Sequence, residues 1–111
     1  MNIVEAREGG VLVLSPQGRL DSNTAKLFEA ALMGKIDGGD RRILVDFGQL
    51  DYISSAGLRV ILMGAKKLKS LNGRFALSSL SENIREVFDI SGFSAILEIH
   101  GDRSSAVAAM S

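Results

Sequence analysis

The chain has 111 residues, 46% of them hydrophobic, which suffices to bury a core as one domain covering residues 1–111. Its 13 basic and 13 acidic residues cancel, so no excess of positive charge indicates a nucleic-acid or membrane surface. Cysteine is absent and there is one histidine, which excludes disulfides and argues against a metal site. The N-terminus lacks the form of a signal peptide, and no apolar run approaches the roughly 18 residues of a membrane span. We therefore expect a cytoplasmic protein.

The first residues predict a hairpin of two strands. Asn2 to Glu8 alternates weakly, as an edge strand does, and Val11 to Leu14 is a short apolar strand. Gly9-Gly10 between them is a strong hairpin turn signal. Pro16 falls near the end of the second strand, where a missing N–H costs least or marks a sheet edge.

A helix is expected next, from Asn23 or Thr24 to Lys35 or Ile36, because apolar residues recur there with helical spacing. Three side chains suited to capping a helix start precede or begin it: Asp21, Ser22 and Asn23.

The middle of the chain predicts a strand followed by a long helix. Arg42 to Phe47 is a largely apolar strand, and Ser55 to about Leu71 carries one apolar stripe with helical spacing. Three lysines gather toward the end of this helix: Lys66, Lys67 and Lys69. Because cations suit the C-terminal end of a helix dipole, we interpret this cluster as a solvated helix end.

The last third predicts a strand at Arg74 to Ser78, a helix from Ser81 to Gly92, a strand at Ala95 to His100 and a short helix at Asp102 to Met110. From the second strand onward, strands and helices alternate. This alternation predicts an α/β fold with a mostly parallel sheet and right-handed crossovers, to which the initial hairpin adds one antiparallel edge strand.

No complete catalytic constellation is visible. The glycine-rich phosphate loops G-x-x-x-x-G-K-[ST] and G-x-G-x-x-G are absent. Ser55 lacks the G-x-S-x-G elbow of a hydrolase, and His100 stands at the end of the last predicted strand. With no evident pair of nucleophile and base, we expect neither an enzyme nor a cofactor.

Ser55 stands where a buried strand gives way to a helix. A hydroxyl at this place can cap the helix, or it can carry or bind a phosphate, because free N–H groups and the helix dipole favour negative charge. Asp21, Asp46 and Asp51 lie near strand ends, the functional rim of a parallel sheet, so Asp21 and Ser55 could be neighbours. The residues themselves leave two classes open: a phosphorylatable binding module, or a small-anion binder.

Three segments together resemble the STAS domain, the sulfate transporter and anti-sigma-factor antagonist family. Tyr52-Ile-Ser-Ser-Ala-Gly-Leu-Arg-Val60, preceded by Leu44-Val-Asp-Phe47, resembles the family signature. Gly18-Arg-Leu-Asp21 is similar to its G-x-[LI]-D segment, and Val87-Phe-Asp-Ile-Ser-Gly-Phe93 to its [LV]-F-x-[IL]-[ST]-G-[LF] segment. The resemblance implies a mixed, mostly parallel sheet with about four helices packed mainly on one face.

The resemblance also implies a function, that of an anti-sigma-factor antagonist in partner switching. In this scheme the unphosphorylated antagonist binds an anti-sigma factor, which is also a serine kinase of the histidine-kinase-like ATPase fold, and so frees the sigma factor. Phosphorylation of the antagonist releases the kinase, and a PP2C-type phosphatase reverses the step. The resemblance brings in neither a nucleic acid nor a membrane as a direct partner.

Aligned on Gly57, the family motif D-S-[ST]-G places the phosphoacceptor at Ser55, with Ser54 as the second choice. The residues implied in partner binding are Asp21, Asp46, Ser54, Ser55, Ala56, Gly57 and Arg59. Ser54 replaces the family aspartate, and Ala56 replaces the second hydroxyl residue. These two departures motivate an alternative: a STAS-like scaffold or small-ligand-binding module that is not phosphorylated.

Overall fold

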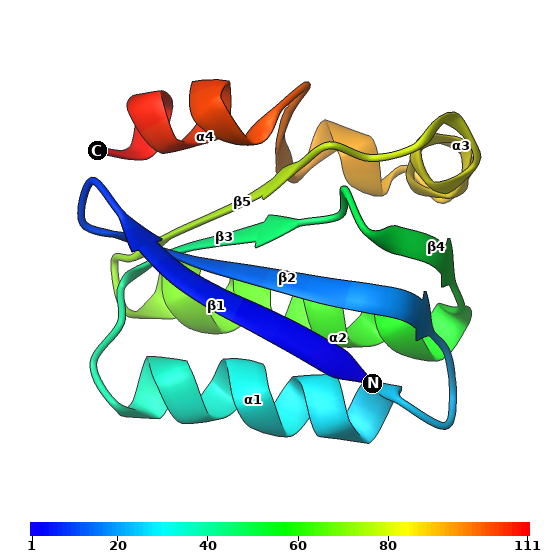
Figure 1. Cartoon of the computed structure of the whole chain (residues 1–111), viewed down its shortest axis with the longest axis horizontal. Coiled ribbons are helices and arrows are strands. Elements are labelled where there is room, and N and C mark those ends of the chain that lie inside the picture. The colour runs from blue at the N-terminus through cyan, green and yellow to red at the C-terminus, as the bar shows by residue number, and fades with distance from the viewer.

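The computed structural model describes residues 1–111, which form one mixed sheet between helices (Figure 1). The strands are β1 (Asn2–Glu8), β2 (Val11–Leu20), β3 (Arg42–Asp46), β4 (Leu50–Ile53), β5 (Arg74–Ser78) and β6 (Glu98–His100). The helices are α1 (Ala25–Asp37), α2 (Ser55–Ser70), α3 (Glu82–Ile90), the 3-10 helix η1 (Phe93–Ala95) and α4 (Arg103–Met110). Along the sheet the order is β1-β2-β3-β5-β6, with β4 paired to β2, and only β1 is antiparallel. The mostly parallel sheet with an antiparallel edge strand, predicted from the alternation of elements, is confirmed.

Strand β2 is longer than the predicted Val11 to Leu14, and it has two parallel partners. Its first half pairs with β3 over Leu12–Leu14, and its second half pairs with β4 over Gly18–Leu20. Pro16 lies in the interval between these two ladders. A residue without an N–H is tolerated there because neither parallel partner is paired with it.

Strand β4 was not expected from the sequence. It has four residues, and its exposed positions are Asp51 and Tyr52, side by side between buried Leu50 and Ile53. A shift of register between Gly18 and Arg19 accompanies the pairing. The usual alternation of buried and exposed residues is therefore missing, and so is the signal by which a half-buried strand is predicted.

Two apolar clusters lie on opposite faces of the sheet. The larger cluster includes buried residues of α1, α2 and α3, among them Phe28, Ile61 and Phe88. The smaller one packs Ala106 and Met110 of α4 onto residues of three strands: Val11, Val13, Leu44 and Ala76. In Figure 1, α1 and α2 lie below the sheet and α4 above it. α3 also contributes to the larger cluster, but in Figure 1 it lies at the right-hand end of the molecule, at the height of α4. The expected packing on one face therefore holds for α1 and α2, and α4 covers the other face.

The last strand is shorter than the predicted Ala95 to His100. Gly92 adopts a positive φ of 80°, and the chain then makes η1 before β6 begins at Glu98. The predicted helix starts at Ser81 and Asp102 are confirmed, since Ser81 Oγ accepts from Ile84 N–H and Asp102 Oδ1 from Ser105 N–H. No helix has the length and apolar character needed to cross a membrane.

Candidate functional site

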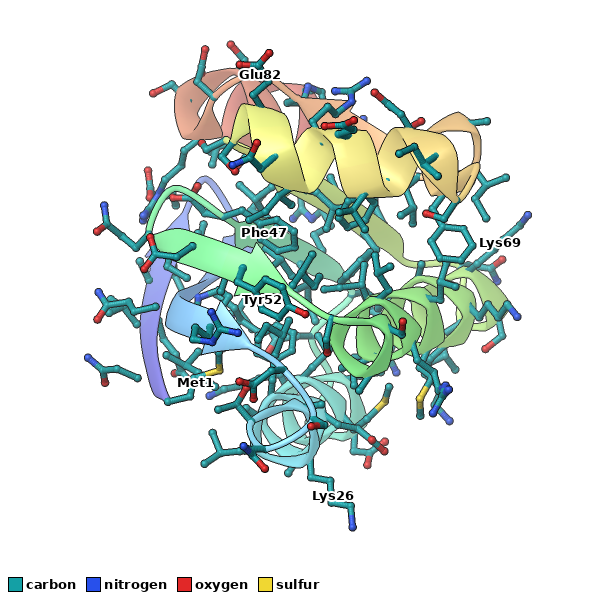
Figure 2. The ribbon with its side chains drawn as sticks, turned by 90° about the vertical axis from the view of Figure 1, so that its right-hand side faces the viewer. Met1, Lys26, Phe47, Tyr52, Lys69 and Glu82 are labelled. Atoms are coloured by element: carbon teal, nitrogen blue, oxygen red, sulfur yellow. The ribbon has the colours of Figure 1, made fainter.

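The starts of α1 and α2 lie at the same end of the sheet. Leu20 and Ile53, the last residues of β2 and β4, are paired in register, and the N–H of Ser54 donates to the carbonyl of Leu20 at 2.9 Å. Asp21 and Ser54 therefore leave the sheet side by side, each leading into a helix. Figure 2 looks onto this end of the molecule. Because both helices begin here, the positive ends of both dipoles gather at this rim.

The two adjacent serines have different roles. Ser54 is the N-cap of α2: its Oγ accepts from Gly57 N–H at 3.3 Å, and its carbonyl accepts from Leu58 N–H at 2.9 Å. Ser55 is the first residue of the helix, its side chain is exposed, and its hydroxyl takes part in no hydrogen bond. The capping role that a serine at this place could have belongs to Ser54, and the Ser55 hydroxyl stands free at the positive end of the helix.

Gly57 allows the first turn of α2 to lie against β2. A Cβ at this position would lie 2.8 Å from both Cγ and the carbonyl oxygen of Leu20, and 2.9 Å from Cγ1 of Ile53. Real Cβ atoms do not approach other atoms so closely, and one of the contacts is rigid backbone. Glycine is required here for close approach, and it holds the serine loop onto the end of the sheet.

Asp21 supplies negative charge beside the loop. Its Oδ1 accepts from the N–H groups of Asn23 at 3.0 Å and Thr24 at 3.2 Å, and Arg19 lies 3.5 Å from its Oδ2. Partial desolvation would raise the pKa of this carboxyl, but the hydrogen bonds from Asn23 and Thr24 outweigh it and the pKa is lowered. Asp21 is thus an anion at neutral pH, fixed in orientation by the turn that leads into α1.

Arg19 and Tyr52 form a second feature of this rim that the sequence reasoning did not select. They pair in register across β2 and β4, and the guanidinium carbon of Arg19 lies 4.2 Å from the centre of the Tyr52 ring. Tyr52 is 41% exposed, so part of its side chain is accessible to a partner close to Ser54. Both residues stand in the motif segments, two positions before Asp21 and Ser54, but only the register of β4 shows that they meet.

Asp46 has other neighbours. Its Oδ1 accepts from Gly48 N–H at 3.1 Å and from the Ser78 hydroxyl at 3.3 Å, while Oδ2 lies 3.7 Å from Arg103 at the start of α4. None of these contacts reaches the serine loop. The predicted partner-binding residues therefore divide into a group at the rim and Asp46 beneath α4.

The remaining predicted residues belong to the first turns of α2. Ala56 is partly buried and packs against the larger apolar cluster. Arg59 is exposed and forms no ion pair within the chain, so its charge is available to a partner.

The side chains of this rim are suited to binding a partner. In the only histidine, His100, the ring atom Nε2 lies 2.7 Å from Oε2 of Glu98 within β6. His100 forms no hydrogen bond with Ser55. No three side chains of the kinds that bind metals lie together. What the rim offers is an exposed hydroxyl at a helix start, a fixed carboxylate, and an exposed aromatic ring.

Comparisons with known proteins agree with this fold. The family model of the STAS domain matches residues 2–106. BtrV of Bordetella bronchiseptica, named as an anti-sigma factor antagonist, is 43% identical over 109 residues, which are 98% of this chain and 94% of BtrV. The anti-sigma-B factor antagonist of Bacillus subtilis is 30% identical over 91 residues, 81% of this chain and 82% of that protein. A solved structure from Thermotoga maritima, described as an anti-sigma factor antagonist, has a TM-score of 0.93 and 25% identity, covering 97% of this chain and 93% of that one. These names describe regulators and not enzymes, in agreement with the prediction that the chain is not an enzyme.

Proposed function

Because the chain belongs to the STAS domain family, we propose that it is an anti-sigma-factor antagonist that acts by partner switching and is turned off by phosphorylation of Ser55. Its partner is an anti-sigma factor that is also a serine kinase of the histidine-kinase-like ATPase fold, and a PP2C-type phosphatase restores the binding form. The exchange takes place in the cytoplasm.

One observation carries the choice of Ser55. Its hydroxyl is exposed and makes no hydrogen bond, while the neighbouring Ser54 performs the capping. A kinase can phosphorylate an exposed serine at this position without unfolding the first turn of α2. Phosphorylation of Ser54 would instead turn the Oγ that accepts from the Gly57 N–H into a phosphate ester oxygen, a weaker acceptor, and would place the phosphate at the cap itself.

The replacement of the family aspartate by Ser54 fits the same scheme. Aspartate and serine are both strong N-caps, so the exchange keeps the start of α2 while it removes one negative charge beside Ser55. Asp21 remains as a fixed carboxylate at the rim. The kinase would therefore meet one acidic group from the loop after β2 and none from position 54.

The switch follows from charge. A phosphate on Ser55 adds about −1.5 to −2 charges near neutral pH. The helix start tolerates this charge, so the chain stays folded. At an interface fitted to a neutral hydroxyl, the phosphate must be desolvated next to Asp21, which is already negative. A penalty of about 3 kcal/mol lowers the affinity for the partner about 100-fold.

The test uses the chain as bait in a lysate of the source cells, with bound proteins identified by mass spectrometry. The wild type and Ser55→Ala are expected to retain an ATPase-fold kinase, and Ser55→Asp to lose it. Ser104→Asp is the matched control, because Ser104 is an exposed serine in the first turn of α4. It should retain the kinase.

Phosphorylation itself is checked with the recovered kinase and ATP. Phosphopeptide mapping should find the phosphate on Ser55 in the wild type and on no residue in Ser55→Ala. If all baits retain the same partners and no phosphate is transferred, the phospho-switch is wrong, and the alternative of an unphosphorylated scaffold or ligand-binding module takes its place.

A further inference from the structure

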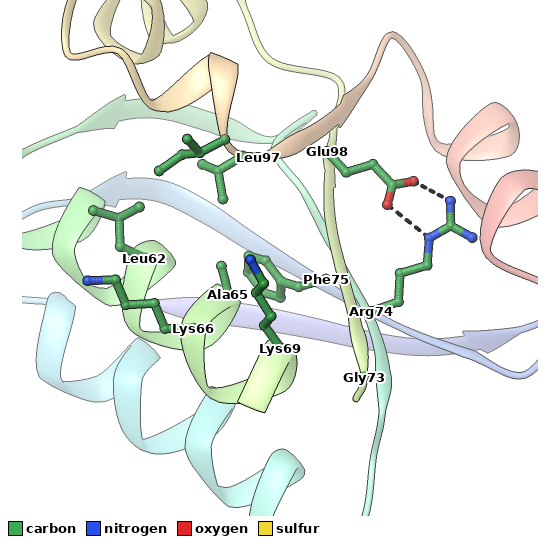
Figure 3. A pocket seen from close by; sticks show the side chains of 10 residues that line it. Leu62, Ala65, Lys66, Lys69, Gly73, Arg74, Phe75, Leu97 and Glu98 are labelled. Carbon is green, nitrogen blue, oxygen red and sulfur yellow. Dashed lines mark hydrogen bonds and ion pairs between the residues drawn. The ribbon is translucent and has the colours of Figure 1, made fainter. Parts of the chain in front are cut away.

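A pocket of about 460 Å³ lies far from the serine loop, between the second half of α2 and the strands β5 and β6 (Figure 3). This volume is within the range of small-molecule sites. Its apolar lining comes from α2, from β5 and from the segment after η1: Leu62, Ala65, Phe75, Ile96 and Leu97. Ile96 is 69% exposed, so its side chain is accessible to a molecule that enters the pocket.

The polar lining is predominantly cationic, with three cations and one carboxylate: Lys66, Lys69, Arg74 and Glu98. Arg74 is already engaged, because its Nε and Nη2 donate to Glu98 at 2.9 and 2.7 Å and its Nη1 donates to the Ala109 carbonyl. Figure 3 shows this pair at one side and the two lysines extending from α2 at the other. Lys66 and Lys69 enter no ion pair within the chain. Two exposed ammonium groups therefore remain without an ion-pair partner beside an apolar cavity whose one carboxylate, Glu98, is held by Arg74.

We propose that this pocket binds a small amphipathic carboxylate, with its carboxylate between Lys66 and Lys69 and its aliphatic chain over Phe75 and Leu97. The apolar lining favours an aliphatic chain, and the two exposed lysines, which have no ion-pair partner within the chain, favour an anionic head. An inorganic anion would leave the apolar lining in contact with water, and a neutral apolar ligand would gain no electrostatic attraction from the two lysines. This inference goes beyond the proposed function and does not depend on it.

The pocket also separates the three lysines at the end of α2, which the sequence analysis interpreted as a solvated helix end, into two groups. Lys66 and Lys69 line the cavity, whereas Lys67 does not. Lys67 has the same charge on the same helix, which makes it the matched control for the role of charge. Ile90, 79% exposed on α3, is the matched control for Ile96.

The first experiment titrates the 15N-labelled chain with hexanoate, octanoate and decanoate and follows amide chemical shifts. We expect saturable changes in chemical shift for the residues that line the pocket. The amides of the serine loop should shift much less than those of the lining. Each CH2 buried strengthens binding about fourfold, so decanoate should bind more than tenfold tighter than octanoate. Affinities that do not depend on chain length, or shifts confined to other surfaces, would overturn the proposal.

The second experiment separates charge from apolar contact. Octanoate should bind at least tenfold tighter than 1-octanol, and the double variant Lys66→Gln/Lys69→Gln should remove that preference. Ile96→Ser should weaken octanoate binding, while Lys67→Gln and Ile90→Ser should leave it unchanged. Equal binding of octanoate and octanol to the wild type, or an equal loss in Lys67→Gln, would show that the cavity is not the carboxylate site.

Discussion

The N–H of Ser54 donates to the carbonyl of Leu20, and this 2.9 Å bond joins the cap of α2 to the last residue of β2. Asp21 follows Leu20 directly, so the same bond fixes the acidic residue of one helix start relative to the serine loop of the other. The cap depends on the hydroxyl of Ser54, whereas the proposed phosphate would be carried by the hydroxyl of Ser55. Substitutions at the two positions can therefore test the stability of the loop and its tolerance of charge separately.

The two serines should differ in their contribution to stability. Ser54→Ala removes the acceptor of the Gly57 N–H and should lower the free energy of unfolding by about 1 kcal/mol. Ser55→Ala removes a hydroxyl without partners and should change it by less than about 0.5 kcal/mol. Urea unfolding followed by circular dichroism measures both. A larger loss for Ser55→Ala than for Ser54→Ala would contradict the assignment of the cap.

A side chain at Gly57 should be costly. Gly57→Ala places a methyl group 2.8 Å from the Leu20 carbonyl and should destabilise the fold by about 1–3 kcal/mol through overpacking. Gly34→Ala is the control within α1, because no atom lies within 4 Å of the added Cβ. It should stabilise the protein by about 0.5–1 kcal/mol, the usual gain over glycine inside a helix. Thermal melts of the two variants should move in opposite directions.

A negative charge at position 55 should leave the fold intact. Ser55→Asp puts a carboxylate at the first position of α2, where the helix dipole stabilises it by about 0.3–1 kcal/mol at low salt. The urea midpoint should stay the same or rise, and a rise should fade as salt is added. A loss of more than about 1 kcal/mol would mean that weaker partner binding by this variant reflects unfolding and not charge.

The pair Arg74–Glu98 should give the chain an acid-sensitive part of its stability. Hydrogen bonds from Arg74 lower the pKa of Glu98 below its ordinary value, against partial desolvation. Because the pKa is lowered in the folded state, this stabilisation is complete above the unfolded value of about 4.3 and is lost as the pH falls through the lowered value. The pair is partly exposed, so about 0.2–1 kcal/mol is at stake.

Glu98→Gln tests this account. The variant should be less stable than the wild type at pH 7, and the difference should shrink as the pH is lowered from 5 to 3. Urea midpoints across this range measure the effect. A difference that stays constant at all these pH values would show that the carboxylate charge of Glu98 contributes nothing.

Much of the fold follows from local sequence signals. The helix starts at Ser81 and Asp102 could be predicted, and both residues cap their helices, as serine and aspartate commonly do before an apolar helical pattern. Strand β5 has the predicted bounds, since Arg74 to Ser78 follows a turn and is continuously apolar in its centre. Signals of this kind involve neighbours in the chain, and they need no knowledge of the tertiary structure.

The site was less predictable, because it depends on pairings between distant residues. The contact of Arg19 with Tyr52 exists only because β4 returns to β2, and β4 itself carries no alternating pattern. Asp46 was grouped with Ser55 because the family resemblance implies it and because it ends the strand before the serine loop. Its side chain instead contacts Ser78 and, at the start of α4, Arg103. Which of Ser54 and Ser55 caps the helix and which has a free hydroxyl depends on the residue at which α2 begins. Sequence patterns locate such boundaries only to within a few residues.

The position of Pro16 also restricts how the sheet can assemble. A slip of β2 by two residues along β3 would bring Pro16 to the place of Leu14, opposite Val45, inside a ladder to which it cannot donate. The same slip would move Gly18 and Arg19, where the register shifts, out of the ladder with β4. A proline nitrogen, which has no hydrogen to donate, in the middle of the longest strand thus disfavours misregistered pairing and favours the pairing of Leu20 with Ile53.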